Sequence, residues 1–354
     1  MLNKLSVDDE LYKYKLQKRI GKGNFGQVWI AKDLTLEKEV AVKILDTSFE
    51  PIFKHLQEAK YGNSVKHQNV VHVHYADIVE FEGSELVIIA MDHHSKGSVL
   101  KELNSANYID IVRATKIIID ILKGLEYLHE CGIYHNDIKP SNILIANNGN
   151  ALLTDYGISI SSSDLKPVQS PNSYRLHAAP ETLKSNNISV QTDVYQLGLT
   201  FYRLVNGIGN VSELRSRLGD SEFNNAKING LILGINDFLP FVPLCIKKII
   251  LKAINSDVTL RYQSALEMRK DLEKIALFGY WTINELGVEV GKFNNYTYVI
   301  EQVKKNGHIE FLPIKVSNLG RKTKIQKRFE ICKTPKKFDQ VKCKFMQDIV
   351  LGNI

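Results

Sequence analysis

The stretch HNDIKPSN, residues 135–142, is the part of the sequence from which the rest of the chain can be interpreted. It places a carboxylate (Asp137), an ammonium group two residues later (Lys139) and a carboxamide five residues after the carboxylate (Asn142) in one tight loop. In such a loop one side chain can meet a hydroxyl group while the others face phosphate and metal, as phosphoryl transfer requires. Taken alone, the stretch is also an ordinary polar turn, since Asn, Asp, Pro and Ser are common loop residues.

Other motifs occur before and after this loop. The segment GKGNFGQV (21–28) has the spacing GxGxxGxV, the run VAVK ends at Lys43, and an acidic residue follows fifteen positions later at Glu58. The triplet DYG begins at Asp155, and AAPE ends at Glu181. Together these motifs resemble the eukaryotic-type protein kinase superfamily, and the DxKPxN form of the loop is similar to that of its Ser/Thr-specific members.

The resemblance extends to about residue 280 and implies an α+β, two-lobed fold. A small, β-rich N-lobe would occupy residues 1–92, and a large, helical C-lobe would occupy residues 93–280. Residues 281–354 lie outside the resemblance. There, alternating apolar and polar residues predict strands at 296–303, 308–316 and 324–331. We therefore expect a small, mostly β C-terminal domain.

Local sequence patterns predict the elements that would carry these motifs. Strands are expected at 16–21, 27–34, 38–45, 71–78 and 84–91. Helices are expected at 51–65, 110–130, 192–206, 241–255 and 263–278. Because the glycine-rich turn lies between two strands and does not open a helix, it favours a flap over phosphates and argues against a dinucleotide fold.

The resemblance implies that ATP is the cofactor and indicates its contacts. Lys43, paired with Glu58, would orient the α- and β-phosphates of ATP. The backbone of Asp92 and His94, just after Met91, would hydrogen-bond the adenine. The glycine-rich flap would supply the remaining contacts, from Gly21, Gly23, Gly26 and Val28.

The resemblance also implies roles for the residues of the loop. Asp137 would be the catalytic base that accepts the proton of a protein Ser or Thr hydroxyl. Lys139 would neutralise the γ-phosphate as it moves. Asn142 and Asp155 would bind Mg²⁺ or Mn²⁺. A protein substrate is therefore expected, and the chain itself could be one.

Some positions depart from the family pattern. Tyr156 stands where the family usually has Phe, and Tyr174 stands where it usually has Thr. Asn136 replaces an Arg that, in many regulated kinases, clamps a phosphorylated activation loop, and Asn cannot make that bidentate contact. Glu181 is expected to pair with Arg261 in a structural role.

The departure at Asn136 leads to a prediction about regulation. Activity should not depend strongly on phosphorylation of the serines between the DYG and AAPE motifs. These serines are Ser161, Ser162, Ser163, Ser170 and Ser173.

Composition narrows the class of protein. The chain has 354 residues, of which 44% are hydrophobic and 24% are charged, and this is typical of a globular protein with more than one unit. Its four cysteines form no CxxC and no close pair, so a reducing compartment is expected. The charged first residues lack the apolar core of a signal peptide. We therefore expect a soluble, cytoplasmic protein without a membrane partner.

The net charge of +7 comes entirely from residues 281–354, which hold 14 Lys and Arg against 7 Asp and Glu. An acidic protein or a nucleic acid could bind such a surface. No nucleic-acid-binding signature is present, so a merely solvated basic face is an equal alternative.

Two other functions share parts of this sequence pattern. A pseudokinase or ATP-binding scaffold would keep the fold and act through its basic C-terminal domain without turnover. The presence of every residue expected to contact phosphate and metal argues against it. A small-molecule phosphotransferase would share the catalytic loop but usually lacks the glycine flap and the AAPE segment.

Overall fold

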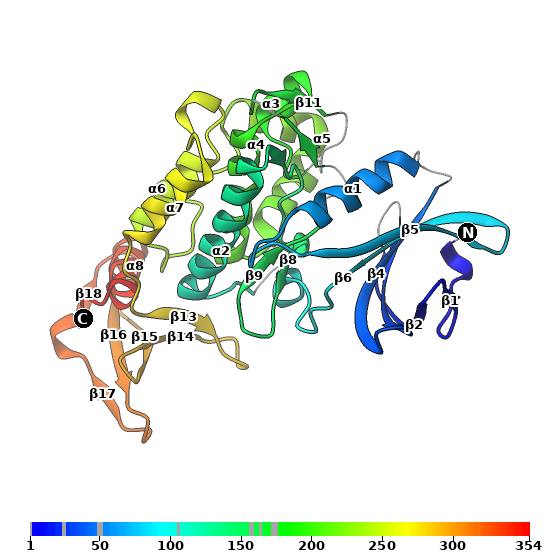
Figure 1. Cartoon of the computed structure of the whole chain (residues 1–354). Coiled ribbons are helices and arrows are strands. Elements are labelled where there is room, and N and C mark those ends of the chain that lie inside the picture. The colour runs from blue at the N-terminus through cyan, green and yellow to red at the C-terminus, as the bar shows by residue number, and fades with distance from the viewer. Residues whose placement is uncertain are drawn as a thin grey trace.

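The computed structural model describes residues 2–22, 26–47, 52–104, 107–155, 159–162, 165–170 and 176–354, without the side chains of residues 3, 52–55, 57 and 58. Several sequence predictions fall outside the described residues: those for Gly23, the Glu58 side chain, Tyr156, Ser163, Ser173 and Tyr174. The chain forms two lobes followed by a C-terminal domain (Figure 1). This is the α+β architecture that the resemblance implied.

The small lobe is built on an antiparallel sheet, in which the strands of the described residues follow the order β1-β2-β3-β4-β6-β5. These strands are β1 (Glu10–Leu11), β2 (Tyr14–Lys22), β3 (Gly26–Asp33), β4 (Lys38–Asp46), β5 (Val73–Phe81) and β6 (Ser84–Met91). Five of them confirm predicted strands. Helix α1 (Ile52–Ser64) covers one face of the sheet, where Leu56 and Ala59 pack against Leu45, Val87 and Ile89.

The large lobe is organised around two long helices, α2 (Ile111–Glu130) and α4 (Val190–Asn206). Asp110 caps α2 by accepting a hydrogen bond from the backbone N–H of Arg113 at 3.0 Å. The other helices are α3 (Pro180–Ser185), α5 (Gly209–Ile228), α6 (Leu244–Ala253) and α7 (Ala265–Glu273). The sequence did not predict α5, because this helix is largely polar and is interrupted at Gly219.

Short elements join these helices. Three antiparallel pairs form: β7 (Ile133–Tyr134) with β10 (Ile160–Ser161), β8 (Ile143–Ile145) with β9 (Ala151–Leu153), and β11 (Val168–Gln169) with β12 (Asn187–Ile188). Short 3-10 helices span Leu2–Lys4, Val99–Glu102, Pro140–Asn142, Val258–Leu260 and Gln326–Arg328. The β7–β10 pair places the start of the catalytic loop beside the segment that follows Asp155.

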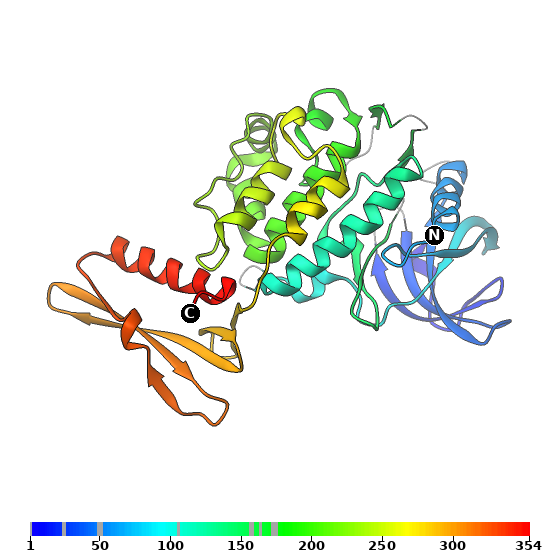
Figure 2. The same ribbon diagram turned by 60° about the vertical axis from the view of Figure 1, so that its left-hand side comes forward.

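The C-terminal domain is β-rich, as predicted, but it also contains a helix (Figure 2). Its antiparallel sheet consists of β13 (Tyr280–Ile283), β14 (Glu289–Phe293), β15 (Tyr296–Lys305), β16 (His308–Val316) and β17 (Lys322–Lys324), with β18 (Glu330–Cys332) also paired to β16. The strand expected at 324–331 was wrong, because a 3-10 turn divides this segment between β17 and β18.

Helix α8 (Pro335–Leu351) lies across one face of this sheet and was not predicted. Its sequence does carry a start signal, since Thr334 accepts a hydrogen bond from Lys337 N at 3.2 Å and Pro335 occupies the first turn. Trp281 is fully buried beneath α8 and donates its indole N–H to Met346 O at 3.0 Å.

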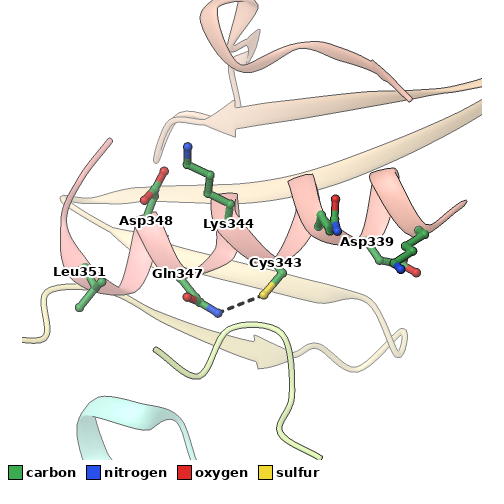
Figure 3. A pocket seen from close by; sticks show the side chains of 8 residues that line it. Asp339, Cys343, Lys344, Gln347, Asp348 and Leu351 are labelled. Atoms are coloured by element: carbon green, nitrogen blue, oxygen red, sulfur yellow. Dashed lines mark hydrogen bonds between the residues drawn. The ribbon is translucent and has the colours of Figure 1, made fainter. Parts of the chain in front are cut away.

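Helix α8 also contacts the large lobe. The carbonyl oxygen of Pro240 accepts hydrogen bonds from Cys343 Sγ at 3.2 Å and from Gln347 Nε2 at 3.0 Å. Figure 3 shows these two side chains on one stripe of the helix, joined by a hydrogen bond. A hollow of about 500 Å³ follows this stripe and is lined by Lys336, Asp339, Gln340, Cys343, Lys344, Gln347, Asp348 and Leu351. The buried side chains of the domain belong to the same continuous core as those of the large lobe.

Candidate active site

The loop HNDIKPSN follows β7 and is fixed from below by α4. Asp193, which is fully buried, accepts hydrogen bonds from the backbone N–H groups of His135 at 2.9 Å and Asn136 at 2.7 Å. His129 donates to the same carboxylate at 2.9 Å. Asn136 has φ +61°, a left-handed conformation that Asn tolerates better than most residues. The loop backbone is therefore held in one shape before any substrate binds.

Asp137, the predicted base, is buried in the loop and only 8% exposed. Its Oδ2 accepts hydrogen bonds from Lys139 Nζ at 2.7 Å and from Asn142 Nδ2 at 2.9 Å. Its Oδ1 has no hydrogen-bond partner among the described residues. Burial raises the pKa of Asp137, and the nearby Lys139 ammonium partly offsets this rise. One oxygen is thus held in place while the other can accept a proton.

His135 supports the loop from inside. Its Nε2 lies 3.1 Å from Thr154 O and its Nδ1 lies 3.3 Å from Asp137 N, so the ring donates through Nε2 and accepts through Nδ1. Burial lowers the pKa of His135. This neutral imidazole ties the catalytic loop to the residue that precedes Asp155.

Lys43 of the small lobe and Asp155 of the large lobe form an ion pair, with Lys43 Nζ 2.8 Å from Asp155 Oδ1. Although partial burial opposes ionisation, the Lys43 charge lowers the pKa of Asp155 to about 2. Asp155 is therefore a carboxylate at any physiological pH. The predicted pairing of Lys43 with Glu58 falls outside the described side chains.

The glycine-rich turn gives different results at its two described glycines. A Cβ atom on Gly26 would lie 2.5 Å from Ile44 O, so only glycine fits there. A Cβ on Gly21 would make only ordinary contacts with Val28, at 3.5 Å. Val28 lies opposite Lys43 in the β3–β4 pair, so both side chains lie on the same face of the sheet.

Asp92 and His94, the residues expected to contact adenine, directly follow β6. Asp92 Oδ1 contacts His74 Nε2 at 2.7 Å, and the carbonyl of His94 accepts a hydrogen bond from Gly97 N at 2.9 Å. The structure thus gathers Lys43 and Asp155 with the loop residues, and it places Asp92 and His94 in the connection between the lobes. Adenine contacts from the latter two remain a prediction.

The donor set suits a hard divalent cation. Asn142 offers a carboxamide oxygen and Asp155 a carboxylate, and oxygen ligands of this kind bind Mg²⁺ together with substrate phosphates. Two protein ligands are enough for such a Mg²⁺ site, because substrate phosphates and water supply the other oxygens. Within the described residues, no cluster of three or more His, Cys, Asp or Glu is suited to hold a metal.

The segment between Asp155 and Glu181 is held by contacts that the sequence did not suggest. Ser170, only 2% exposed, accepts a hydrogen bond from Asn136 Nδ2 at 3.2 Å. His177 is fully buried, with Nδ1 donating to Ile138 O at 2.8 Å and Nε2 accepting from Arg203 Nη1 at 2.7 Å. Burial and the Arg203 charge hold the pKa of His177 well below its usual value. The end of this segment is thus tied directly to the catalytic loop.

Two further cations hold the end of the segment. Arg261 binds Glu181 through both terminal nitrogens, at 2.9 and 2.8 Å, which confirms the predicted structural pair. Lys227 on α5 is buried and donates to Ala178 O at 3.0 Å. Burial, assisted by Arg215, lowers the pKa of Lys227 to about 7. Lys227 could not be found from the sequence, because α5 itself was not predicted.

Among the described residues, none of the helices combines the length and the apolar composition needed to cross a membrane.

A β-rich lobe, a helical lobe and a loop with Asp, Lys and Asn at kinase spacing define the class of this protein. The model of the protein kinase domain family matches residues 14–234. The chain therefore belongs to the protein kinase domain family.

Individual relatives agree with this assignment. The serine/threonine-protein kinase PrkC of Bacillus subtilis is 30% identical over 74% of this chain and 40% of its own length. A protein of Lactococcus lactis named probable serine/threonine-protein kinase PknB is 28% identical over 73% of this chain and 41% of its own length. The serine/threonine-protein kinase PknB of Mycobacterium leprae is 25% identical over 74% of this chain and 43% of its own length. This chain thus spans less than half the length of these relatives.

Proposed function

We propose that the protein transfers the γ-phosphoryl group of ATP to Ser or Thr hydroxyls of protein substrates, including its own. The observation that carries this proposal is the carboxylate of Asp137, with Oδ2 held by two donors and Oδ1 buried without a partner among the described residues. A general base needs this combination of fixed position and one available oxygen.

The loop residues would divide the work of the reaction. Asp137 Oδ1 accepts the proton of the attacking hydroxyl, while Lys139, 2.7 Å from Oδ2, neutralises charge on the transferred group. Lys43 orients the α- and β-phosphates once ATP enters the cleft. Asn142 and Asp155 would hold Mg²⁺ or Mn²⁺, and the metal would supply positive charge to offset that of the ATP phosphates.

Substitution of Asp137 by Ala tests this proposal. The variant should keep its fold and bind ATP, but its turnover should fall by roughly a hundredfold or more, because a positioned base contributes about 10² to 10⁴. Asp155→Ala should remove metal-dependent ATP binding as well. The matched control is Asp339→Ala, which removes an exposed carboxylate on α8.

Labelled ATP, magnesium and mapping of the phosphorylated sites supply the measurement. Phosphate on Ser or Thr of a generic protein supports the proposal. ATP binding without phosphate transfer would identify an ATP-binding scaffold, and transfer only to a small molecule would identify a different phosphotransferase. Wild-type rates in Asp137→Ala or Asp155→Ala would refute the assigned roles.

We further propose that residues 281–354 form a separate functional domain that attracts an acidic partner, either a protein or a nucleic acid. Several of its acidic groups are already paired internally, such as Glu289 with Lys342 and Asp348 with Arg328, both within 2.7 Å. The basic excess is exposed on and after β17, at Lys322, Lys324 and Lys327. An acidic surface would therefore meet uncompensated positive charge there.

Charge neutralisation tests this proposal better than truncation, because the domain shares a continuous core with the large lobe. Lys322, Lys324 and Lys327 are changed together to Gln, and binding to polyglutamate and to single-stranded DNA is measured across a salt series. Binding should weaken and lose part of its salt dependence, since exposed charges are screened over about 8 Å at physiological salt. The matched control neutralises three exposed lysines of the large lobe, Lys116, Lys248 and Lys270. Equal effects of both triplets would contradict the proposal.

We infer a cytoplasmic location from the chemistry of the site and of the thiols. The proposed reaction needs ATP, and all four cysteines are free thiols, which persist in a reducing compartment.

We also propose that the chain divides into three domains or lobes at residues 1–92, 93–280 and 281–354, which limited proteolysis can test.

A further inference from the structure

The small-lobe sheet has a second apolar face, opposite the one that α1 covers (Figure 1). We name residues 2–11 the N-terminal strap. Three leucines of the strap, Leu2, Leu5 and Leu11, pack into a cluster on this face. The sheet contributes the buried residues Tyr14, Leu16, Trp29, Ala31, Val40, Val42, Ile44, Leu86, Ile88 and Ala90. The strap is therefore the cover of an otherwise exposed hydrophobic surface.

One buried amide interrupts this apolar face. Gln27 is 1% exposed, its Nε2 donates to Leu2 O at 2.8 Å, and its Oε1 accepts from Trp29 Nε1 at 2.9 Å. A buried amide is tolerated only when its donors and acceptors are paired, because an unpaired polar group there costs free energy. Here one partner is the strap and the other is the strand itself, so the amide is correctly paired only while the strap is docked.

Gln27 also lies next to the glycine-rich turn. It follows Gly26, the last glycine of that turn, and is paired with Ile44 in β4. Gly26 is fixed against the Ile44 carbonyl, where no Cβ fits. The next residue, Val28, lies opposite Lys43. Because side chains alternate along a strand, Gln27 points to the strap while Val28 faces the proposed nucleotide side.

The strap has further attachments away from Gln27, including the pairing of β1 (Glu10–Leu11) with β2 and an ion pair between Asp8 and Lys15 at 3.1 Å. Lys4 pairs with Glu82 at 2.8 Å, but both side chains are about half exposed or more, and such pairs contribute little. Backbone hydrogen bonds join Asp8 N to Leu16 O at 2.8 Å and Leu16 N to Asp9 O at 2.9 Å. Among the described residues, the Gln27 bond to Leu2 is thus a polar link between the start of the strap and the strand that follows the glycine-rich turn.

We propose that Gln27 is a positioning residue for the nucleotide. By tying the docked N-terminal strap to β3 directly after the glycine-rich turn, it fixes Gly26 and Val28, two residues expected to contact ATP. Release of the strap lowers ATP affinity without altering the groups that perform the chemistry. This inference rests on the proposed function for the identity of the nucleotide, but its main readout is binding and not turnover.

Gln27→Met tests the proposal, because Met keeps the length of the side chain and removes both hydrogen bonds. The full chain is titrated with a non-hydrolysable ATP analogue and magnesium, and KM for ATP, kcat and Tm are measured alongside. The Kd for the analogue and the KM for ATP should each rise by about 3- to 10-fold while kcat changes by less than about twofold, the pattern of lost ground-state binding.

Two further variants separate positioning from stability. Val40→Ala removes volume from the same core at the end of β3–β4 remote from the turn, where Val40 pairs with Ala31. It should lower Tm without raising the Kd. Leu5→Ala loosens the strap directly and should raise the Kd. Its effect should be non-additive with that of Gln27→Met, since both act through one contact network.

The outcomes distinguish this inference from the proposed function. A lower Tm with unchanged Kd in Gln27→Met, or equal Kd changes in Gln27→Met and Val40→Ala, would overturn the positioning role. Failure of the wild-type chain to bind the analogue would overturn it too. Shifted Kd values in a protein that transfers no phosphate would support the positioning role and refute the kinase proposal. If Gln27→Met fails to fold, the comparison of Leu5→Ala with Val40→Ala decides the matter.

Discussion

Replacing Asp193 by Asn tests how firmly α4 holds the catalytic loop. The Asp193 carboxylate accepts hydrogen bonds from two loop N–H groups, those of His135 and Asn136, and from the ring of His129. Asn has nearly the same shape, but one of its two terminal atoms is an NH₂ group. That group can only donate, so at least one donor of the present set would face another donor.

The size of the effect follows from the bonds that are lost. A hydrogen bond to a charged group contributes about 1.5 to 3 kcal/mol. Losing one bond and weakening the others should lower the free energy of unfolding by about 2 to 5 kcal/mol, which is less than the total stability of about 5 to 15 kcal/mol of a typical protein. At about 2 to 4 °C per kcal/mol, Tm should fall by roughly 4 to 20 °C. Because a 1 Å displacement of a catalytic group can cost about a hundredfold, kcat should fall at least tenfold even in the folded variant.

Calorimetry for Tm and phosphate transfer well below Tm give the two measurements. Asp339→Asn on α8 is the control, since this carboxylate is exposed and should shift Tm by less than about 2 °C. A fall in Tm with kcat unchanged would refute the idea that Asp193 positions the loop. Unchanged Tm and unchanged kcat would refute the energetic reasoning as a whole.

Two other predictions follow from the site. In Lys139→Met the pKa of Asp137 should rise further, because burial already raises it and Lys139 is the group that offsets this rise. The acid limb of kcat/KM, where Asp137 must lose its proton, should therefore move to higher pH. In Lys139→Arg, which keeps the positive charge, this limb should stay nearly in place. A limb that moves to lower pH would contradict this. Ser170→Ala should keep activity within about threefold, whereas Ser170→Asp should lower both activity and Tm by placing a carboxylate in a buried site. Higher activity in Ser170→Asp would instead indicate that phosphorylation activates the enzyme.

Much of the fold could be predicted because local pattern and final structure agree there. The glycine-rich turn lies between β2 and β3 as expected, and α2 begins at Ile111, directly after the capping residue Asp110 and at the start of an apolar stripe. The pair of Glu181 and Arg261 could be anticipated only through the family resemblance, since 80 residues separate them. Sequence pattern therefore predicted these elements, and the resemblance predicted the long-range pair of Glu181 with Arg261.

Other features could not be predicted, because their cause is tertiary. Helix α8 mixes charged, polar and apolar residues, and its apolar residues, such as Phe345, are explained only by the sheet that they cover. Gln27 reads as an ordinary strand residue, and nothing local suggests that its amide bonds a residue 25 positions earlier. The contact between His177 and Arg203 likewise could not be predicted, because His and Arg are both basic residues and a pairing between them is not expected from sequence.

The polar residues of α4 show how these separate contacts form one support. Asp193, Gln196, Thr200 and Arg203 follow one another at spacings of three or four residues, so they lie along one side of the helix. All four are buried. Asp193 and Gln196 bond the backbone of the catalytic loop, and Thr200 donates to Ile138 O at 3.2 Å.

Arg203 continues this stripe to the segment that precedes Glu181, because it donates to His177, which in turn donates to Ile138 O. A buried helix that carries four polar residues on one stripe would be destabilising unless each group were paired. Here the partners are the backbone and side chains that flank the proposed base, so the contacts that satisfy these polar groups of α4 also align the catalytic loop. Any substitution on this stripe should therefore lower stability and kcat together, whereas a substitution at Gln27 should change nucleotide affinity and leave kcat nearly constant.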